Sequence, residues 1–174
     1  MYIQDEKKPI ARSVLMKVPF LFAGLLAGLL LSRIFFQTYT IADDSMLPNL
    51  KKGDRAVIFK AMAPKPGDIV LVNSPIERHR VMIKRLIAEG GDVVEIKNKL
   101  FYVNSTEFNF QWPVVARDRR VFPENFSGRD SMPVIKINQG YCFVIGDNLD
   151  YSFDSRDFGP VSEKNIIGRV IFKY

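Results

Sequence analysis

A membrane-spanning helix followed by a mainly β domain is the fold class that this sequence predicts. Three observations support it: one long apolar segment near the N-terminus, a series of short strand-like segments after it, and turn sequences between those segments. The chain of 174 residues is long enough for one domain of ordinary size beside a membrane anchor. Its 10 Pro, 11 Gly and 14 Phe favour strands and turns over helices.

The apolar segment has the length of a transmembrane helix. No charged residue occurs from Val18 to Leu31. The wider segment 14–36 forms, as a helix, a rod of roughly 34 Å, which is enough to cross a bilayer. Lys17 and Arg33 lie near its ends, where long side chains can carry their charge to the headgroups.

Basic residues before the apolar segment set its expected orientation. By the positive-inside rule, residues 1–13 are expected in the cytoplasm, residues 14–36 as a single transmembrane anchor in the cell membrane, and residues 37–174 outside. Two alternatives remain open: a buried helix of a soluble domain, and a signal peptide cleaved after Ala42. The length of the segment and the charge of Arg33 favour a retained anchor. The basic residues are Lys7, Lys8, Arg12 and Lys17.

After the anchor, the sequence alternates between strand-like and turn-like segments. The turns have the compositions Lys-Lys-Gly-Asp, Lys-Pro-Gly-Asp and Glu-Gly-Gly-Asp. Residues 99–138 are less regular and contain three prolines, so we expect a smaller inserted β-rich subdomain between two halves of one antiparallel sheet. The expected strands are rich in β-branched or aromatic residues and cover 55–60, 68–73, 81–87, 92–97, 100–103, 141–145 and 169–174.

Charge and the scarcity of His and Cys argue against several functions. The net charge of +6 would permit binding to nucleic acid, but the Lys and Arg residues are scattered, so no nucleic-acid partner is expected. Cys142 is the only cysteine and lies in an apolar run, which indicates a buried structural thiol. His79 is the only histidine and lies among charged residues, as a surface histidine does.

Two short segments carry a possible nucleophile and base. In the first, residues 44–48, Ser45 precedes a proline turn just after the anchor. By itself this position is weak evidence for a nucleophile, since serine is a common turn and cap residue. In the second, the apolar strand 81–87, Lys84 and Arg85 stand side by side in the middle. Because strand side chains alternate, the two bases are expected on opposite faces, with at least one of them desolvated.

A desolvated lysine can replace histidine as a base. Full burial can lower a lysine pKa by up to ~3 to 5 units, which leaves a neutral amine near physiological pH. Such an amine can take the proton of a serine hydroxyl, and serine with lysine is a known catalytic pair. We therefore interpret Ser45 as the nucleophile and Lys84 as its base. An edge strand from which both bases reach water is the alternative.

A third segment, residues 146–156, is polar and follows a buried-looking strand. Ser152 can hydrogen-bond and orient the lysine amine, and Asp154 and Arg156 can pair and hold the loop rigid. A calcium loop is the alternative, but the segment lacks the glutamate and the central glycine of an EF-hand. We therefore expect neither a metal nor another cofactor.

Together, in this order and behind an anchor, the three segments resemble the type I signal peptidase (leader peptidase) family of membrane serine peptidases. That family has a Ser-Met-x-Pro block, a Lys-Arg block followed by Gly-Asp, and a Gly-Asp-Asn block followed by Ser-x-Asp-Ser-Arg. The matching residues here are Ser45-Met46-Leu47-Pro48, Lys84-Arg85 with Gly91-Asp92, and Gly146-Asp147-Asn148 with Ser152-Phe153-Asp154-Ser155-Arg156.

The resemblance implies an all-β catalytic domain with a Ser/Lys dyad at the membrane surface. Its implied partners are the lipid bilayer and secretory preproteins that carry small residues before the cleavage site. It also implies that Ser152 contacts the amine of Lys84 and that Asp154 and Arg156 form a structural ion pair.

One departure from the family pattern bears on the mechanism. Asp43 stands where members commonly have Ser or Gly, and a Ser there lends a hydroxyl to the oxyanion hole. This leaves the backbone N–H of Ser45 as the expected donor. The other departures replace no reacting group and are Asn49, Ala88, Gly90 and Leu149.

Two other functions remain open beside signal-peptide cleavage. A self-cleaving repressor with a Ser/Lys pair would have a DNA-binding helical domain where this chain has an anchor. A non-catalytic, membrane-tethered β-domain that binds partner proteins would keep the motifs without activity. Asp43 is the feature that favours this second alternative.

Overall fold

The computed structural model describes residues 10–174, with side chains described from Lys17 onward. The expected cytoplasmic segment 1–13 therefore lies mostly outside the described residues. The chain divides into two units, residues 1–36 and 37–174, which are described separately.

The first unit is one helix, α1 (Ile10–Phe35). Its part Lys17–Phe35 has 19 residues and a mean hydropathy of 2.0, so it is long and apolar enough to cross a membrane. All side chains from Lys17 to Phe35 are exposed, as expected of a helix that lipid covers. The predicted N-terminal apolar helix is confirmed.

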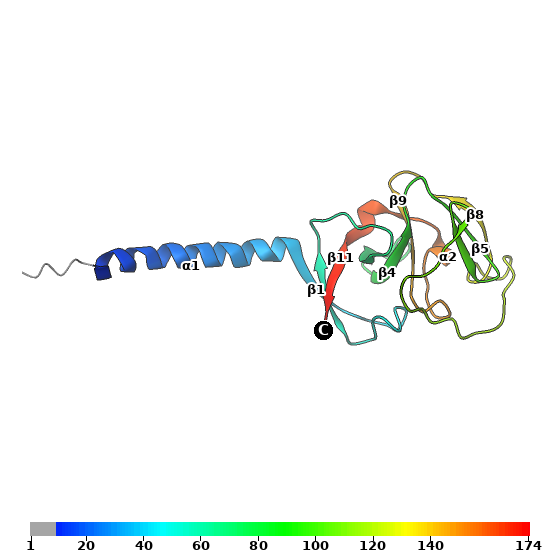
Figure 1. Cartoon of the computed structure of the whole chain (residues 1–174), viewed down its shortest axis with the longest axis horizontal. Helices are drawn as coiled ribbons and strands as arrows, with labels where there is room; N and C mark the ends of the chain where they lie inside the picture. Colours follow the sequence, from blue (N-terminus) through cyan, green and yellow to red (C-terminus); the bar gives the residue numbers. More distant parts are fainter. Residues whose placement is uncertain (1–9) are drawn as a thin grey trace, which may run out of the picture. The chain divides into compact units, whose positions relative to one another are not determined.

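The second unit consists mainly of two antiparallel sheets, which confirms the predicted fold class (Figure 1). Besides the strands it has a short helix, α2 (Ser155–Phe158), and one 3-10 turn. The strands are β1 (Phe36–Thr40), β2 (Arg55–Phe59), β3 (Ile69–Asn73), β4 (Val81–Ala88), β5 (Val93–Lys97), β6 (Leu100–Val103), β7 (Thr106–Glu107), β8 (Met132–Lys136), β9 (Tyr141–Ile145), β10 (Val161–Ser162) and β11 (Ile166–Lys173).

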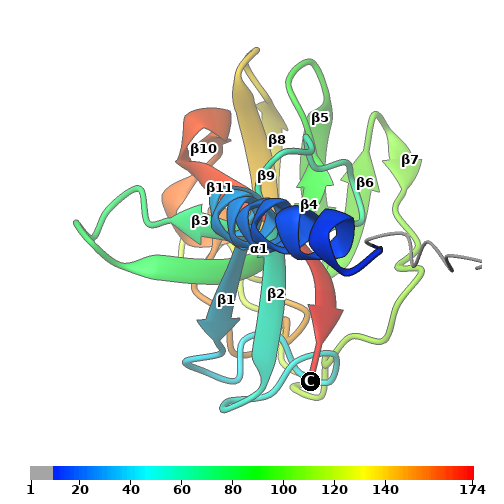
Figure 2. The same ribbon diagram turned by 90° about the vertical axis from the view of Figure 1, so that its left-hand side faces the viewer.

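The larger sheet has seven strands in the order β1-β2-β11-β3-β4-β9-β10, and the smaller has four in the order β7-β6-β5-β8. Figure 2 shows β5, β6 and β7 grouped on one side of this unit and β3 and β10 on the other. In the sequence, β5 to β8 come between β4 and β9, which pair directly with each other. Strand β4 therefore lies inside the larger sheet and is not an edge strand.

Strand β4 is buried along nearly its whole length because apolar side chains cover both of its faces. On one face Ile83 packs with Leu71 and Met46, and on the other Leu86 packs with Val70. This alternation puts Lys84, opposite Val70, on a different face from Arg85, opposite Ile145, as the sequence predicted.

Several elements were not expected from the sequence. Strands β7 and β10 have two residues each, too few for a periodic pattern. Strand β8 contains Pro133, a residue that argues against a central strand, but β8 is an edge of the smaller sheet, where proline is tolerated. The last strand begins at Ile166, three residues before the expected segment 169–174.

The isolated Cys and His behave as the sequence indicated. Cys142 is a buried free thiol, and burial, with the nearby charge of Glu163, raises its pKa to about 12. His79 is exposed. Neither residue contributes to a candidate catalytic pair.

Candidate active site

Ser45 lies on a tight loop between β1 and β2. The N–H of Leu47 donates to the carbonyl of Asp44, and the N–H of Leu50 donates to the carbonyl of Met46 at 2.9 Å. Met46 and Leu50 are buried and fasten the loop to the core beside Ile83. Only 4% of Ser45 is exposed, so the hydroxyl is held in a fixed, largely dry position.

The loop after β9 holds the serine loop in place. The N–H of Asn148 donates to the carbonyl of Ser45 at 2.9 Å, and the side-chain amide of Asn148 donates to the carbonyl of Asp44 at 3.2 Å. A β-carbon at Gly146 would collide with Ser152 Oγ and with the carbonyl oxygen of Ser45. Only glycine permits this close approach, a role that the sequence did not indicate.

Lys84 is buried in the middle of β4, with 3% of its surface exposed. Its Nζ donates a hydrogen bond to Ser152 Oγ at 2.9 Å. Burial lowers the pKa of Lys84, while the charges of Asp154 and Asp43 oppose this shift and those of Arg156 and Arg80 add to it. A neutral amine is therefore more accessible at Lys84 than at a lysine in water.

Asp154 and Arg156 form a buried, bidentate ion pair. Arg156 Nε donates to Asp154 Oδ1 and Arg156 Nη2 to Asp154 Oδ2, both at 2.9 Å. Asp154 also caps α2 and accepts a hydrogen bond from the N–H of Gly146 at 2.9 Å. Burial alone would raise the pKa of Asp154, but the charge of Arg156 and the hydrogen bonds keep it below its usual range. The pair thus fixes the segment that presents Ser152.

One cavity of about 420 Å³ brings the reactive side chains together. Among the described residues, Ser45 Oγ is buried and has no partner in hydrogen-bond geometry, although the Asp43 carboxylate is near enough to the Ser45 side chain for this contact to lower the pKa of Asp43. A buried polar atom without a partner is costly and is often found at functional sites. The lining residues are Asp43, Ser45, Arg80, Met82, Lys84, Asp150, Tyr151, Ser152 and Phe153.

Arg85 and Asp147 form a second buried ion pair, whose partnership the sequence did not reveal. Arg85 Nε and Nη2 donate to Asp147 at 2.7 and 2.6 Å, and Nη1 donates to the carbonyl of Gly67 at 2.7 Å. The Arg85 guanidinium also lies over the ring of Trp112, 4.2 Å from its centre. The two bases of β4 are therefore both buried, and each has its own partner on its own face.

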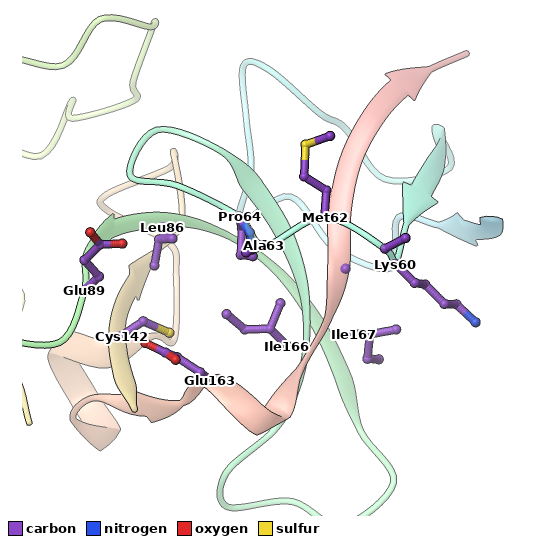
Figure 3. A pocket seen from close by; sticks show the side chains of 12 residues that line it. Lys60, Met62, Ala63, Pro64, Leu86, Glu89, Cys142, Glu163, Ile166 and Ile167 are labelled. Atoms are coloured by element: carbon purple, nitrogen blue, oxygen red, sulfur yellow. The ribbon is translucent and has the colours of Figure 1, made fainter. Parts of the chain in front are cut away.

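A larger cavity of about 440 Å³ lies elsewhere in this unit and contains none of the predicted site residues. Figure 3 shows Glu89 and Glu163 on the same side of this cavity as Cys142, with Lys60 extending away from them. Its size does not make it the candidate active site, because its one thiol, Cys142, has a raised pKa and donates to the carbonyl of Val161. The smaller cavity contains the candidate nucleophile Ser45 and the candidate base Lys84.

Asp43 makes a contact that bears on the expected oxyanion donor. Its carboxylate Oδ1 accepts a hydrogen bond from the backbone N–H of Ser45 at 3.0 Å. The backbone N–H of Ser45, which we expected to stabilise the oxyanion, is thus already hydrogen-bonded to a side chain. No sequence pattern indicated this contact.

The family match and the relatives found by comparison with known proteins agree with one another. The family described as "Signal peptidase, peptidase S26" matches residues 14–174. Signal peptidase I V of Bacillus subtilis is 36% identical over 143 residues, covering 76% of this chain and 82% of that protein. Probable signal peptidase I-1 of Synechocystis sp. is 30% identical over 171 residues, covering 90% of this chain and 80% of that protein.

A plant relative is similar over the same part of the chain but is a longer protein. Probable thylakoidal processing peptidase 2 of Arabidopsis thaliana is 35% identical over 164 residues, covering 88% of this chain and 42% of that protein. The chain spans less than half the length of this and of a second thylakoidal relative. The family match covers nearly the whole chain, including all three segments around the cavity, and the chain therefore belongs to the signal peptidase family, peptidase S26.

Proposed function

We propose that this protein is a membrane-bound serine endopeptidase that removes signal peptides from exported precursor proteins. Ser45 is the nucleophile and Lys84 the general base. The observation that carries the proposal is the cavity that contains both an unpartnered, buried Ser45 Oγ and a buried lysine with a lowered pKa. The family match supports the same function.

The reaction follows from these two groups. Neutral Lys84 Nζ takes the proton of Ser45 Oγ, which attacks the scissile carbonyl carbon and forms a tetrahedral intermediate. The C–N bond breaks, the leaving amine takes the proton from the Lys84 ammonium, and an acyl-enzyme remains. Water then gives a proton to Lys84 and attacks the ester, and the Lys84 ammonium returns that proton to the departing Ser45 Oγ. This releases a carboxylic acid product, which ionises in water, and restores neutral Lys84 and the Ser45 hydroxyl.

Three neighbours keep Lys84 suitable for this task. Ser152 Oγ accepts a hydrogen bond from Nζ at 2.9 Å and so orients the amine. Asp154 and Arg156 are positioning residues, since their ion pair fixes the loop that carries Ser152. Such support limits the freedom of the base and reduces the cost of reaching the reactive geometry.

The substrates and the membrane placement belong to the same proposal. Residues 14–36 anchor the enzyme in the cell membrane, residues 1–13 lie in the cytoplasm, and residues 37–174, with an inserted subdomain at about 99–138, act outside at the lipid surface. The precursors carry small residues before the cleavage site. The basic residues before the apolar helix support this orientation.

A preprotein cleavage assay with purified full-length protein in detergent tests the function. Wild type should release a mature fragment, whereas Ser45→Ala and Lys84→Ala should release none while keeping the circular dichroism spectrum of the wild type. Lys97→Ala is the matched control, because the side chain of this lysine is 63% exposed and its amine contacts Glu95 and the ring of Tyr102, neither of which lines the cavity. Cleavage by the Lys84→Ala protein would refute the dyad. A wild type that binds preproteins without cutting them would instead be a non-catalytic β-domain.

A further inference from the structure

A carboxylate occupies the backbone N–H of the candidate nucleophile. Asp43 Oδ1 accepts a hydrogen bond from the N–H of Ser45 at 3.0 Å. An aspartate that accepts from the N–H two residues on is a common way to close a loop. Here, however, Asp43 lines the same cavity as Ser45 and Lys84, so its carboxylate lies at the reaction site itself.

Asp43 is held in its charged form. Burial alone would raise the pKa of this half-buried carboxyl group, but the hydrogen bonding with Ser45 and the positive charges of Lys84 and Arg80 outweigh burial and lower the pKa. An anionic oxygen therefore rests on the Ser45 amide at neutral pH.

Acyl transfer at Ser45 needs the same N–H group. When Ser45 Oγ attacks, the carbonyl oxygen of the substrate becomes an anion beside the N–H of the nucleophile, and one such donor can be worth about 10²–10³ in kcat. One N–H cannot serve two oxygens fully, and two anionic oxygens at hydrogen-bond distance from one proton repel each other. Asp43 must leave the amide before the intermediate can use it.

Arg80 offers the displaced carboxylate a new partner. It lines the same cavity, and its charge already acts on Asp43. Its present partner is Glu77, and both side chains of that pair are 49% exposed. Such an exposed pair is weak, so Arg80 can turn to Asp43 at little cost. Movement of Asp43 towards Arg80 would exchange one polar partner for another and leave no buried charge unpaired.

We propose that Asp43 is a positioning residue that closes the oxyanion site in the free enzyme and opens it when a precursor binds. The inference rests on the proposed peptidase function and adds to it that substrate binding regulates access to the oxyanion site. The bound precursor backbone competes with Asp43 for the Ser45 amide, so full activity requires an occupied cleft.

Two substitutions at position 43 test this in the full chain. Asp43→Gly removes the carboxylate and adds no donor, whereas Asp43→Ser removes it and adds a hydroxyl. We expect Asp43→Gly to raise kcat/KM for a preprotein by roughly tenfold or more, within the range of one oxyanion donor. The matched control is Asp54→Ser, because the Asp54 carboxylate accepts from the N–H of Lys51 at 3.1 Å and does not line the cavity. Its kcat/KM should stay close to that of the wild type.

A binding measurement separates this role from a merely structural one. A peptide boronic acid forms a tetrahedral anion on a reactive serine, whereas a peptide amide of the same sequence stays neutral. Asp43→Gly should increase the affinity for the boronic acid more than the affinity for the amide. If the substitution only loosens the serine loop, the affinity for both peptides should fall.

Each result decides between the inference and the proposed function. If wild type cleaves and Asp43→Gly is no faster, or if only Asp43→Ser is faster, the inference is wrong and the function stands. If wild type binds the precursor but is nearly inactive and Asp43→Gly cleaves, while Asp43→Gly combined with Ser45→Ala does not, then Asp43 blocks the site without being displaced, and the proposed opening is wrong. If neither the wild type nor either variant cleaves, the proposed function fails, and the inference fails with it.

Discussion

Replacing Asp147 by alanine should strip the buried Arg85 guanidinium of its counter-ion. Arg85 is 7% exposed and Asp147 is fully buried, and two hydrogen bonds of 2.7 and 2.6 Å join them. Removing one partner of a buried pair leaves an uncompensated charge and costs ~3–5 kcal/mol. Asn49 would also lose its 2.8 Å hydrogen bond to Asp147 Oδ2. For a domain whose unfolding free energy is about 5–15 kcal/mol, this is a large fraction of the total.

The single tryptophan provides the assay. Trp112 lies 4.2 Å from the Arg85 guanidinium, so its fluorescence should report the loss of this region in urea or on heating. We expect Asp147→Ala to lower the unfolding temperature by about 6–20 °C, from ~2–4 °C for each kcal/mol. The double variant Arg85→Met with Asp147→Ala should recover part of the loss, because no unpaired charge remains.

Glu77→Ala is the matched control, since it breaks a half-exposed ion pair with Arg80 and should cost about 0–1 kcal/mol. The reasoning fails if Asp147→Ala costs no more than Glu77→Ala. It also fails if the double variant is as unstable as the sum of the two single ones, because the pair would then have no coupling energy.

Four further results are expected. The pH profile of kcat/KM should rise with the deprotonation of Lys84 and level off below the usual lysine pKa of about 10.4; a profile centred at or above that value would contradict the desolvated amine. The unfolding free energy should rise with pH between the lowered folded pKa of Lys84 and about 10.4, because the unfolded chain binds more protons there, and Lys84→Met should remove this rise in denaturant titrations at several pH values. Ser152→Ala should lower kcat by about 10-fold or more with little change in KM, since it removes the 2.9 Å hydrogen bond that orients the Lys84 amine. Gly146→Ala should lower both the unfolding free energy and kcat, because its β-carbon would collide with Ser152 and with the carbonyl oxygen of Ser45. Wild-type kinetics of Ser152→Ala would show that the hydrogen bond is dispensable, and wild-type kinetics of Gly146→Ala would show that the close approach at Gly146 is dispensable.

The strand pattern was predictable where the chain repeats a simple rule. Strand β9 was expected at 141–145 and is found there, and β4 extends one residue beyond the expected 81–87, because apolar and β-branched residues fill both segments. Strand β10, with two residues, and β8, with its proline, gave no such pattern. They form because neighbouring strands supply their hydrogen-bond partners, which the local sequence does not show.

The candidate site was predictable as a set of residues and in two of its contacts, Lys84 with Ser152 and Asp154 with Arg156, but not in its other contacts. Alternation along β4 was enough to put Lys84 and Arg85 on opposite faces. It could not show that both are buried, nor that Arg85 pairs with Asp147, which is 62 residues further along the chain. Such partners are chosen by the pairing of β4 with β9, which brings the loop after β9 to both faces.

The sequence by itself determined the apolar helix and the mainly β domain, because periodicity and turn chemistry are local properties of the chain, and the order of its motifs selected a candidate serine, a candidate lysine and three candidate supporting residues. Only the tertiary structure decided that Arg85 pairs with Asp147 and that Asp43 occupies the Ser45 amide. These contacts depend on burial and on atomic distances between distant segments. Both are set by how the sheet and its loops pack, so the order of residues alone could not give them.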